Sequence, residues 1–347
     1  MTRTMVRKAA PLLILFGVAC WGGWLAAPQA LPPVAFHFQT ARALLAAGHA
    51  RAALRELDLA ARAHEVAPAT ALWRAKCYAA LGEWAPVPAL LQGYLERHPD
   101  QEEALYWLGA AQFHLRQFDA AQATLQQAVS ANPRDGAAWR VLGLVALEHD
   151  QRRAAYEDWQ RAVAVNPRDA EACYLIGRLF YESNYFSESD QWMSRTMAIT
   201  PHDYRAAYYR GLAQEALGKL EAALTLYQAS IRESRAQQVA YAWPYGAAGR
   251  LLTKLSRLAE AQQVIEAGLQ RAPDARVYTA YGELLAQQHD WSKAEAALRH
   301  AVTLDPALPD PHYPLSRVLT ALGARDAAAL EMTRFRQLQQ AQRPRQR

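Results

Sequence analysis

Apolar residues along this 347-residue chain recur at the intervals of three and four residues typical of α-helices, and no segment alternates apolar and polar residues as a strand would. Small residues recur within this pattern every 34 residues. They are Gly109, Gly143, Gly177 and Gly211, followed twelve positions later by Ala121, Ala155, Ser189 and Ala223. Two helices approach closely only where neither carries a bulky side chain. These positions therefore predict the contact line between paired antiparallel helices.

Larger residues and prolines keep the same period. Sixteen residues after each glycine position stands a large side chain that we expect to fill the core: Leu125, Trp159, Met193, Tyr227, Ile265 and Leu298. Proline cannot continue a helix, and prolines 34 residues apart separate successive helix pairs: Pro99, Pro133, Pro167 and Pro201. The phase slips by four extra residues near Arg235–Tyr241. A fixed period of this length indicates a solenoid of helical hairpins, which functions through an extended surface.

At these positions the chain resembles the tetratricopeptide repeat family. The clearest repeat, Ala137–Pro167, contains Trp139, Gly143 and Trp159. We identify eight full repeats and a partial ninth, which begin near Val34, Pro68, Glu102, Gly136, Ala170, Tyr204, Ala242, Ala275 and Pro309. The resemblance implies an all-α fold, a right-handed superhelical solenoid of stacked antiparallel helix pairs over residues 34–338.

The N-terminal segment has a different composition. Arg3, Arg7 and Lys8 precede the uncharged run Ala9–Ala27. Nineteen helical residues span roughly 28 Å, close to the hydrocarbon thickness of a bilayer. Basic residues favour the cytoplasmic side of a membrane. The order of these features predicts a single-pass inner-membrane protein that is anchored through its N-terminal helix and holds its repeats in the periplasm.

The expected organisation of the chain follows from this interpretation. A basic cytoplasmic N-terminus (1–8) precedes a transmembrane signal-anchor (9–27), a linker (28–33), the solenoid (34–338) and a basic tail (339–347). Two alternatives stay open for the first of these segments. A cleaved signal peptide would leave a periplasmic protein. The tetrapeptide that ends at Cys20 resembles a lipoprotein box, so lipidation of Cys20 is the other alternative.

The net charge of +5 does not by itself indicate nucleic-acid binding, because of where it lies. Residues 1–30 carry three cations, residues 334–347 carry five, and neither segment contains an acid, which leaves −3 for residues 31–333. The repeats are therefore slightly acidic, and we expect no nucleic-acid partner.

Motifs that carry catalysis are absent from the sequence. It contains no Gly-rich phosphate loop, no nucleophile elbow and no metalloprotease helix motif, and its ten histidines are scattered. We therefore expect no enzymatic activity, no metal and no cofactor.

The first helix of each repeat carries the candidate binding surface. Residues three before, one after and four after the glycine position share one helix face. The resemblance implies that this face lines a concave groove where extended peptides or partner helices bind. Its central part is rich in aromatic residues and arginine, which dominate binding hot spots. The candidate partner-binding residues are Tyr106, Phe113, Arg140, Tyr174, Arg178, Tyr181 and Tyr208. C-terminal positions such as Thr279 and Glu283 are expected to contribute little.

These features predict a non-enzymatic protein–protein interaction scaffold of the bacterial cell envelope that binds a partner segment in its concave groove. The alternative is a module that binds carbohydrate or cell-wall polymer, in which groove aromatics stack on sugar rings. Each groove aromatic can also serve only to pack the solenoid. The sequence leaves open the partner, the pathway and the oligomeric state.

Overall fold

The computed structural model describes residues 33–62 and 69–342, and every regular element in these ranges is an α-helix. The all-α prediction is confirmed. The predicted basic N-terminus (1–8), the signal-anchor (9–27) and the linker except Pro33 lie outside the described residues. Among the helices of the described ranges, none has both the length and the apolar composition needed to cross a membrane.

The chain divides into two compact domains, residues 1–70 and residues 71–347. In the described part of the first domain, α1 (Pro33–Ala46) and α2 (Ala50–Arg62) form one helical hairpin. Three small residues of this pair are buried, namely Ala41, Ala53 and Ala60. The first of the predicted repeats, which begins near Val34, therefore forms a helical hairpin with buried small residues.

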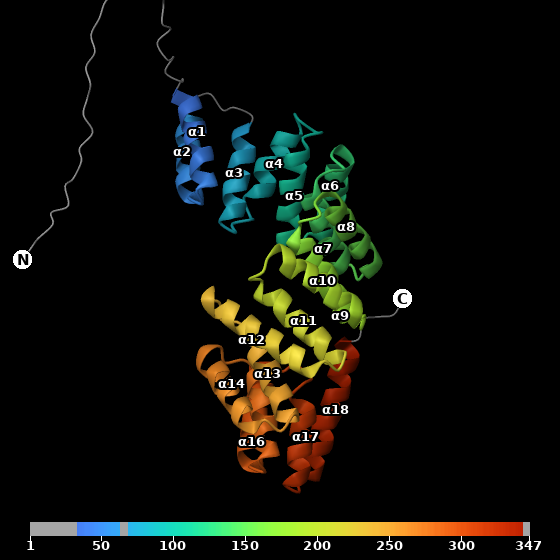
Figure 1. Cartoon of the computed structure of the whole chain (residues 1–347). Helices are drawn as coiled ribbons and strands as arrows, with labels where there is room; N and C mark the ends of the chain where they lie inside the picture. The colour runs from blue at the N-terminus through green and yellow to red at the C-terminus, as the bar shows by residue number, and fades with distance from the viewer. Residues whose placement is uncertain (1–32, 63–68, 343–347) are drawn as a thin grey trace, which may run out of the picture. The chain divides into compact units, whose positions relative to one another are not determined.

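The second domain, which we call the main domain, contains eight further helix pairs in its described part, stacked in chain order (Figure 1). The first helices of these pairs are α3 (Ala69–Ala80), α5 (Glu102–His114), α7 (Gly136–Glu148), α9 (Ala170–Glu182), α11 (Tyr204–Ala216), α13 (Trp243–Lys254), α15 (Ala275–Gln287) and α17 (His312–Ala321). The second helices are α4 (Val87–Leu95), α6 (Phe118–Ala131), α8 (Arg152–Val165), α10 (Phe186–Ile199), α12 (Leu220–Ala236), α14 (Leu258–Arg271), α16 (Trp291–Leu304) and α18 (Arg325–Gln342).

The helix starts agree with the predicted repeat starts. In the described residues, five first helices begin at the predicted residue, and none begins more than three residues away. The ninth repeat, expected to be partial, contains both of its helices, with 10 residues in α17 and 18 in α18. The insertion near Arg235–Tyr241 lengthens α12 to 17 residues, against 14 in α10. Most of the insertion thus adds about one helical turn.

Glycine allows the two helices of a pair to meet. A Cβ atom on Gly109 would lie 2.6 Å from Cγ of Leu125, closer than real contacts allow. The same clash would occur in six pairs of the main domain: Gly109–Leu125, Gly143–Trp159, Gly177–Met193, Gly211–Tyr227, Gly249–Ile265 and Gly282–Leu298. All six large side chains are fully buried, which confirms the predicted core position. Burial of side chains of this size contributes about 1.5–3 kcal/mol each.

All nine first helices of the described residues end at a left-handed residue. Two positions beyond each helix, the backbone φ lies between 58° and 81°. Glycine fills four of these positions: Gly48, Gly82, Gly218 and Gly323. The other five are Arg116, Asp150, Asn184, Ser256 and His289. A side chain in this geometry costs roughly 1–2 kcal/mol. The hairpin therefore imposes this backbone conformation even where no glycine is present.

The first helices of the main domain also pack against one another from repeat to repeat. α5 contacts α7, α9 contacts α11, α11 contacts α13, and α15 contacts both α13 and α17. Within the described residues, no second helix packs to a comparable extent against the second helix of the next repeat. The first helices therefore line the inner face of the stack, and the second helices form its outer face.

We expect Gly143→Ala to destabilise the main domain although alanine favours helices. The new methyl group would meet the rigid ring of Trp159, whose Cδ1 would lie 2.6 Å away, and overpacking of this kind typically costs about 1–3 kcal/mol. Gly136→Ala on the same helix is the matched control, because its methyl group would make only ordinary contacts, the nearest at 3.4 Å. Urea unfolding followed by circular dichroism compares the two variants. Equal unfolding midpoints would contradict the role assigned to the glycine.

Candidate functional site

The two most N-terminal candidates lie half-buried on α5. Tyr106 packs edge-on against Trp107, with ring centroids 5.0 Å apart, and Phe113 packs against Phe118 of α6 at 5.9 Å. Burial raises the pKa of the Tyr106 hydroxyl, and the opposing charge of Arg140 limits this rise. Both rings thus contribute to packing and still present part of their surface on the inner face.

Arg140 is bound to the next repeat. Its Nη1 donates to Oδ2 of Asp169 at 2.5 Å. Asp169 is buried and caps the N-terminus of α9, where its Oδ1 accepts from the backbone N–H of Ala172 at 3.0 Å. The guanidinium therefore links α7 to α9, and this structural contact uses part of its hydrogen-bonding capacity.

Tyr174 and Tyr208 are core residues, each only 6% exposed. Tyr209, which the sequence analysis did not single out, joins them: its ring centroid lies 5.8 Å from that of Tyr174 and 5.5 Å from that of Tyr208. Tyr241 and Trp243 cover Tyr208, each at 5.7 Å. These two candidates therefore offer little surface to a partner.

Arg178 and Tyr181 of α9 remain accessible on the inner face. Arg178 is partly exposed, and its Nε lies 3.3 Å from Oε1 of Glu182 on the same helix. Tyr181 is half-buried against Phe186 and Tyr209. Burial raises the pKa of Tyr181 to about 12, so its hydroxyl keeps its proton at neutral pH and can donate a hydrogen bond.

Beyond Tyr181 the inner face is hollowed. One hollow of about 560 Å³ lies between α9, α11, α13 and α15, and a second of about 720 Å³ continues toward α17. The two share Arg250, Lys254 and Glu283, so they form one continuous depression, which we call the inner groove. Its other lining residues include Tyr181, Leu212, Glu215, Trp291, Tyr313 and Arg317.

The inner groove carries charges of both signs. Arg250 lies at its centre, and its Nη1 donates to Oδ2 of Asp310 at 3.3 Å. Burial raises the pKa of Glu283, although the charge of Arg250 opposes this shift. Glu215 is held in place by the hydroxyl of the buried Tyr227, which donates to its Oε2 at 2.6 Å. Lys254 and Arg317 are exposed cations at its edges.

The C-terminal half of the inner face was expected to contribute little to binding, but it contains most of the charged residues of the inner groove. Thr279 is buried, and its hydroxyl donates to the carbonyl of Ala275 at 2.7 Å, so it is not a groove residue. Glu283, expected to contribute little, lines both hollows. A signal was present in the sequence, because charged residues occupy the groove-facing positions of three successive first helices: Glu215, Arg250 and Glu283.

Comparison with protein families supports the repeat assignment. Two models described as tetratricopeptide repeat match the chain, one over residues 89–145 and the other over residues 190–237 and 247–309. No curated protein sequence matches the chain.

Solved structures with the same architecture include a tetratricopeptide repeat protein from Parabacteroides merdae ATCC 43184. It is 16% identical with a TM-score of 0.55, and the match covers 73% of this chain and 98% of that one. PilF of Pseudomonas aeruginosa is 20% identical with a TM-score of 0.52, over 62% of this chain and 96% of its own. A chain of the APC/C hetero-tetramer Cut9–Hcn1 is 14% identical with a TM-score of 0.60, over 82% of this chain and 55% of its own. At these identities the likeness shows the fold.

We expect Arg140→Ala to lower stability more than Arg178→Ala. The first change leaves the buried Asp169 carboxylate without its cation, and loss of such a partner costs about 1–3 kcal/mol. The second removes a partly exposed pair within one helix, worth about 0.3–0.5 kcal/mol. Urea unfolding of the two variants compares the same residue change in neighbouring repeats. If both variants unfolded at the same urea concentration, the contact of Arg140 with Asp169 would not stabilise the packing of α7 against α9.

Proposed function

We propose that this chain, which tetratricopeptide repeat models match over residues 89–145, 190–237 and 247–309, is a non-enzymatic scaffold that binds a segment of a partner protein in the inner groove. The observation that carries the proposal is the continuity of the two hollows from α9 to α17. A continuous depression along several first helices suits an extended peptide or a helix better than a compact small molecule.

The side chains of the groove suit a segment that mixes apolar and charged residues. Tyr181, Trp291 and Tyr313 offer aromatic surface, and Tyr313 is 45% exposed. Tyrosine, tryptophan and arginine are the residues that most often dominate binding energy at interfaces. Cations and carboxylates alternate along the floor, so a partner with charges in the complementary order would be favoured over one without them.

The exposure and hydrogen bonding of Arg250 suit a residue that binds a partner better than one that only packs the solenoid. Its side chain is 36% exposed although it lies in a depression, and within the described residues it makes one hydrogen bond, to Asp310. A guanidinium has five N–H donors in a fixed plane. Most of these donors stay free to bind carboxylate or carbonyl oxygens of a partner segment.

We also propose that the scaffold works in the bacterial cell envelope. The support is the sequence order of Arg3, Arg7 and Lys8 before the uncharged run Ala9–Ala27, in a segment that lies outside the described residues. An anchor of this kind would place the inner groove outside the cytoplasm.

A fusion experiment tests the location. We expect a reporter that is active only in the periplasm to be active when fused after Arg347, and a cytoplasmic reporter at the same place to be inactive. The reverse pattern would contradict the envelope proposal and would leave the inner groove unaffected.

The groove itself is tested by the double variant Tyr181→Ala, Arg250→Ala. Partners are captured by pull-down from solubilised membranes with the unchanged chain and identified by quantitative mass spectrometry, and affinity is then measured by calorimetry. Loss of each anchor should weaken binding about 30-fold, and loss of both up to roughly 1,000-fold, because each hot-spot residue typically contributes about 2 kcal/mol.

The matched control changes the same residue types outside the inner groove, in the double variant Arg153→Ala, Tyr185→Ala. Both side chains are exposed, at 93% and 57% respectively. We expect this control to keep full affinity. If both double variants bound the partner equally well, the inner groove would not be the binding site.

A further inference from the structure

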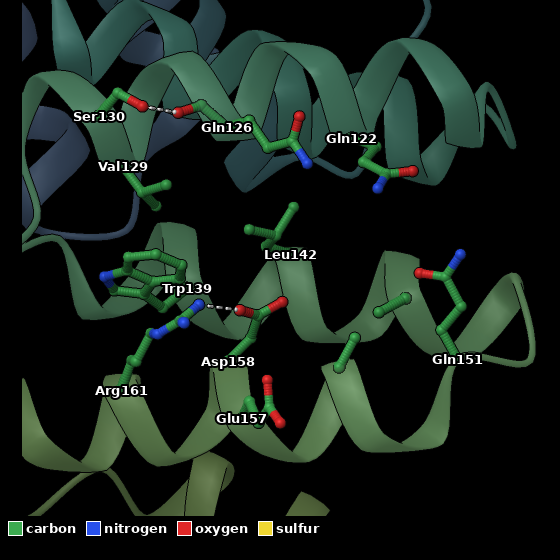
Figure 2. Close-up of a pocket in the computed structure, with 12 residues that line it drawn as sticks. Gln122, Gln126, Val129, Ser130, Trp139, Leu142, Gln151, Glu157, Asp158 and Arg161 are labelled. Carbon is green, nitrogen blue, oxygen red and sulfur yellow. Dashed lines mark hydrogen bonds and ion pairs between the residues drawn. The ribbon is translucent and has the colours of Figure 1, made fainter.

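A separate hollow opens on the outer face of the main domain, between two successive second helices. It has a volume of about 470 Å³, with α6 on one side, α8 on the other and α7 as its floor (Figure 2). Trp139, Leu142 and Ala146 of α7 and Val129 of α6 form its apolar part. We call this hollow the outer pocket.

The polar residues of the outer pocket surround one buried carboxylate. Asp158 of α8 is only 7% exposed, and its Oδ1 accepts a hydrogen bond from Nη1 of Arg161 at 2.9 Å (Figure 2). Within the described residues, Oδ2 of Asp158 has no hydrogen-bond partner. This oxygen is not among the fully enclosed polar atoms without a partner in the described residues, so it stays accessible from the hollow. It can therefore accept a hydrogen bond from a group that enters the outer pocket.

Burial has a measurable effect on this carboxylate. It raises the pKa of Asp158 to about 6, against the opposing charge and hydrogen bond of Arg161, and the nearby charge of Glu157 adds to the rise. Both of these charged neighbours belong to α8. Among the lining residues, α6 and α7 contribute only glutamine, serine and apolar side chains. No second cation in the lining compensates the buried charge.

We propose that the outer pocket binds a lysine or arginine side chain that projects from a partner polypeptide. The charge is complementary, because the lining contains the carboxylates of Asp158 and Glu157 and the single cation Arg161. Glu157 already pairs with Arg153, whose Nε donates to its Oε1 at 2.9 Å. The free oxygen of Asp158 is therefore the acceptor left for an incoming cation.

The remaining surface fits the rest of such a ligand. The methylene stem of a basic side chain can lie along Val129, Leu142 and Ala146. Amide side chains line the walls at Gln122, Gln126 and Gln151, and each offers both donors and acceptors to a peptide backbone. This combination favours a basic residue within a polypeptide over a free inorganic cation.

Arg161 shows how the pocket holds a guanidinium. It lies over the ring of Trp139, with 4.7 Å between its Cζ and the ring centroid, while it donates to Asp158. Its side chain is 54% exposed, so it can move away without opening the core. An incoming cation would either bind Asp158 beside Arg161 or displace Arg161 from Asp158 and from the ring of Trp139.

The test uses the full chain and three capped tripeptides that carry lysine, arginine or norleucine between two glycines. Binding is followed at pH 7.5 through the indole N–H resonance of Trp139, assigned with Trp139→Phe. We expect saturable shifts with the lysine and arginine peptides and none with norleucine. Asp158→Asn should weaken binding at least tenfold, and Arg161→Gln should strengthen it because the competing guanidinium is gone.

Asp119→Asn is the matched control, since it makes the same change at a fully exposed site on α6. It should leave binding unchanged. Binding should also fall as the pH is lowered through about 6, where Asp158 takes up its proton. Three results would each overturn the proposal. The first is equal shifts with all three peptides, and the second is no shift up to the solubility limit in either the unchanged chain or Arg161→Gln. The third is unchanged binding in Asp158→Asn.

The stability of Asp158→Asn gives a second measurement that does not need a ligand. A carboxyl whose folded pKa lies above its ordinary value of 3.8 destabilises the folded state when ionised. This penalty is absent below pH ~4, grows between about 4 and 6, and is complete above that range. The variant should therefore melt roughly 2–4 °C higher at pH 7.5 and show no such gain below pH ~4. A lower melting temperature at pH 7.5 would show that Asp158 serves only to pair with Arg161, and would overturn the proposal.

Discussion

The close approach of two helices at a glycine is the constraint on which the other features of this protein depend. In six repeats of the main domain, a large buried side chain of the second helix occupies the space that a Cβ atom of the first helix would need. This contact fixes which face of each first helix turns toward its own partner. The opposite residues of that helix are then left to meet the next repeat or the solvent, and successive first helices come together on the inner face.

Two different binding surfaces follow from this arrangement. On the inner face, first helices converge, so charged residues from α11, α13 and α15 gather around Arg250 in one depression. On the outer face, successive second helices pack less closely than the first helices do in the described repeats, and the space between α6 and α8 reaches down to α7. Asp158 of α8 lines that space together with residues of α6 and α7 (Figure 2).

The repeat boundaries and the core could be predicted because the 34-residue period places residues with the same structural role at the same position of each repeat. Trp159 and Met193 differ in chemistry, but both stand sixteen residues after a glycine, and both are fully buried. The binding surface was harder to predict. Tyr208 and Tyr181 share a helix face in the periodic pattern, yet Tyr208 is covered by Tyr241, at the end of the inserted segment, and by Trp243, at the start of α13. Spacing gives the direction of a side chain around its helix, and it does not give the distance to the next repeat. The burial of Asp158 likewise depends on how far apart neighbouring repeats lie, which the spacing of residues in the sequence does not give.

The variety of side chains at the glycine contact has a consequence for folding. Arrays of similar repeats can misassemble when a helix pairs with an equivalent helix from the wrong repeat. Here Leu125, Trp159, Met193, Tyr227 and Ile265 present different shapes to their glycines. A mispaired hairpin would leave a void beside a smaller side chain or force a larger one against the backbone, and either fault destabilises a core by several kcal/mol. The differences between repeats thus favour pairing of each second helix with the first helix of its own repeat.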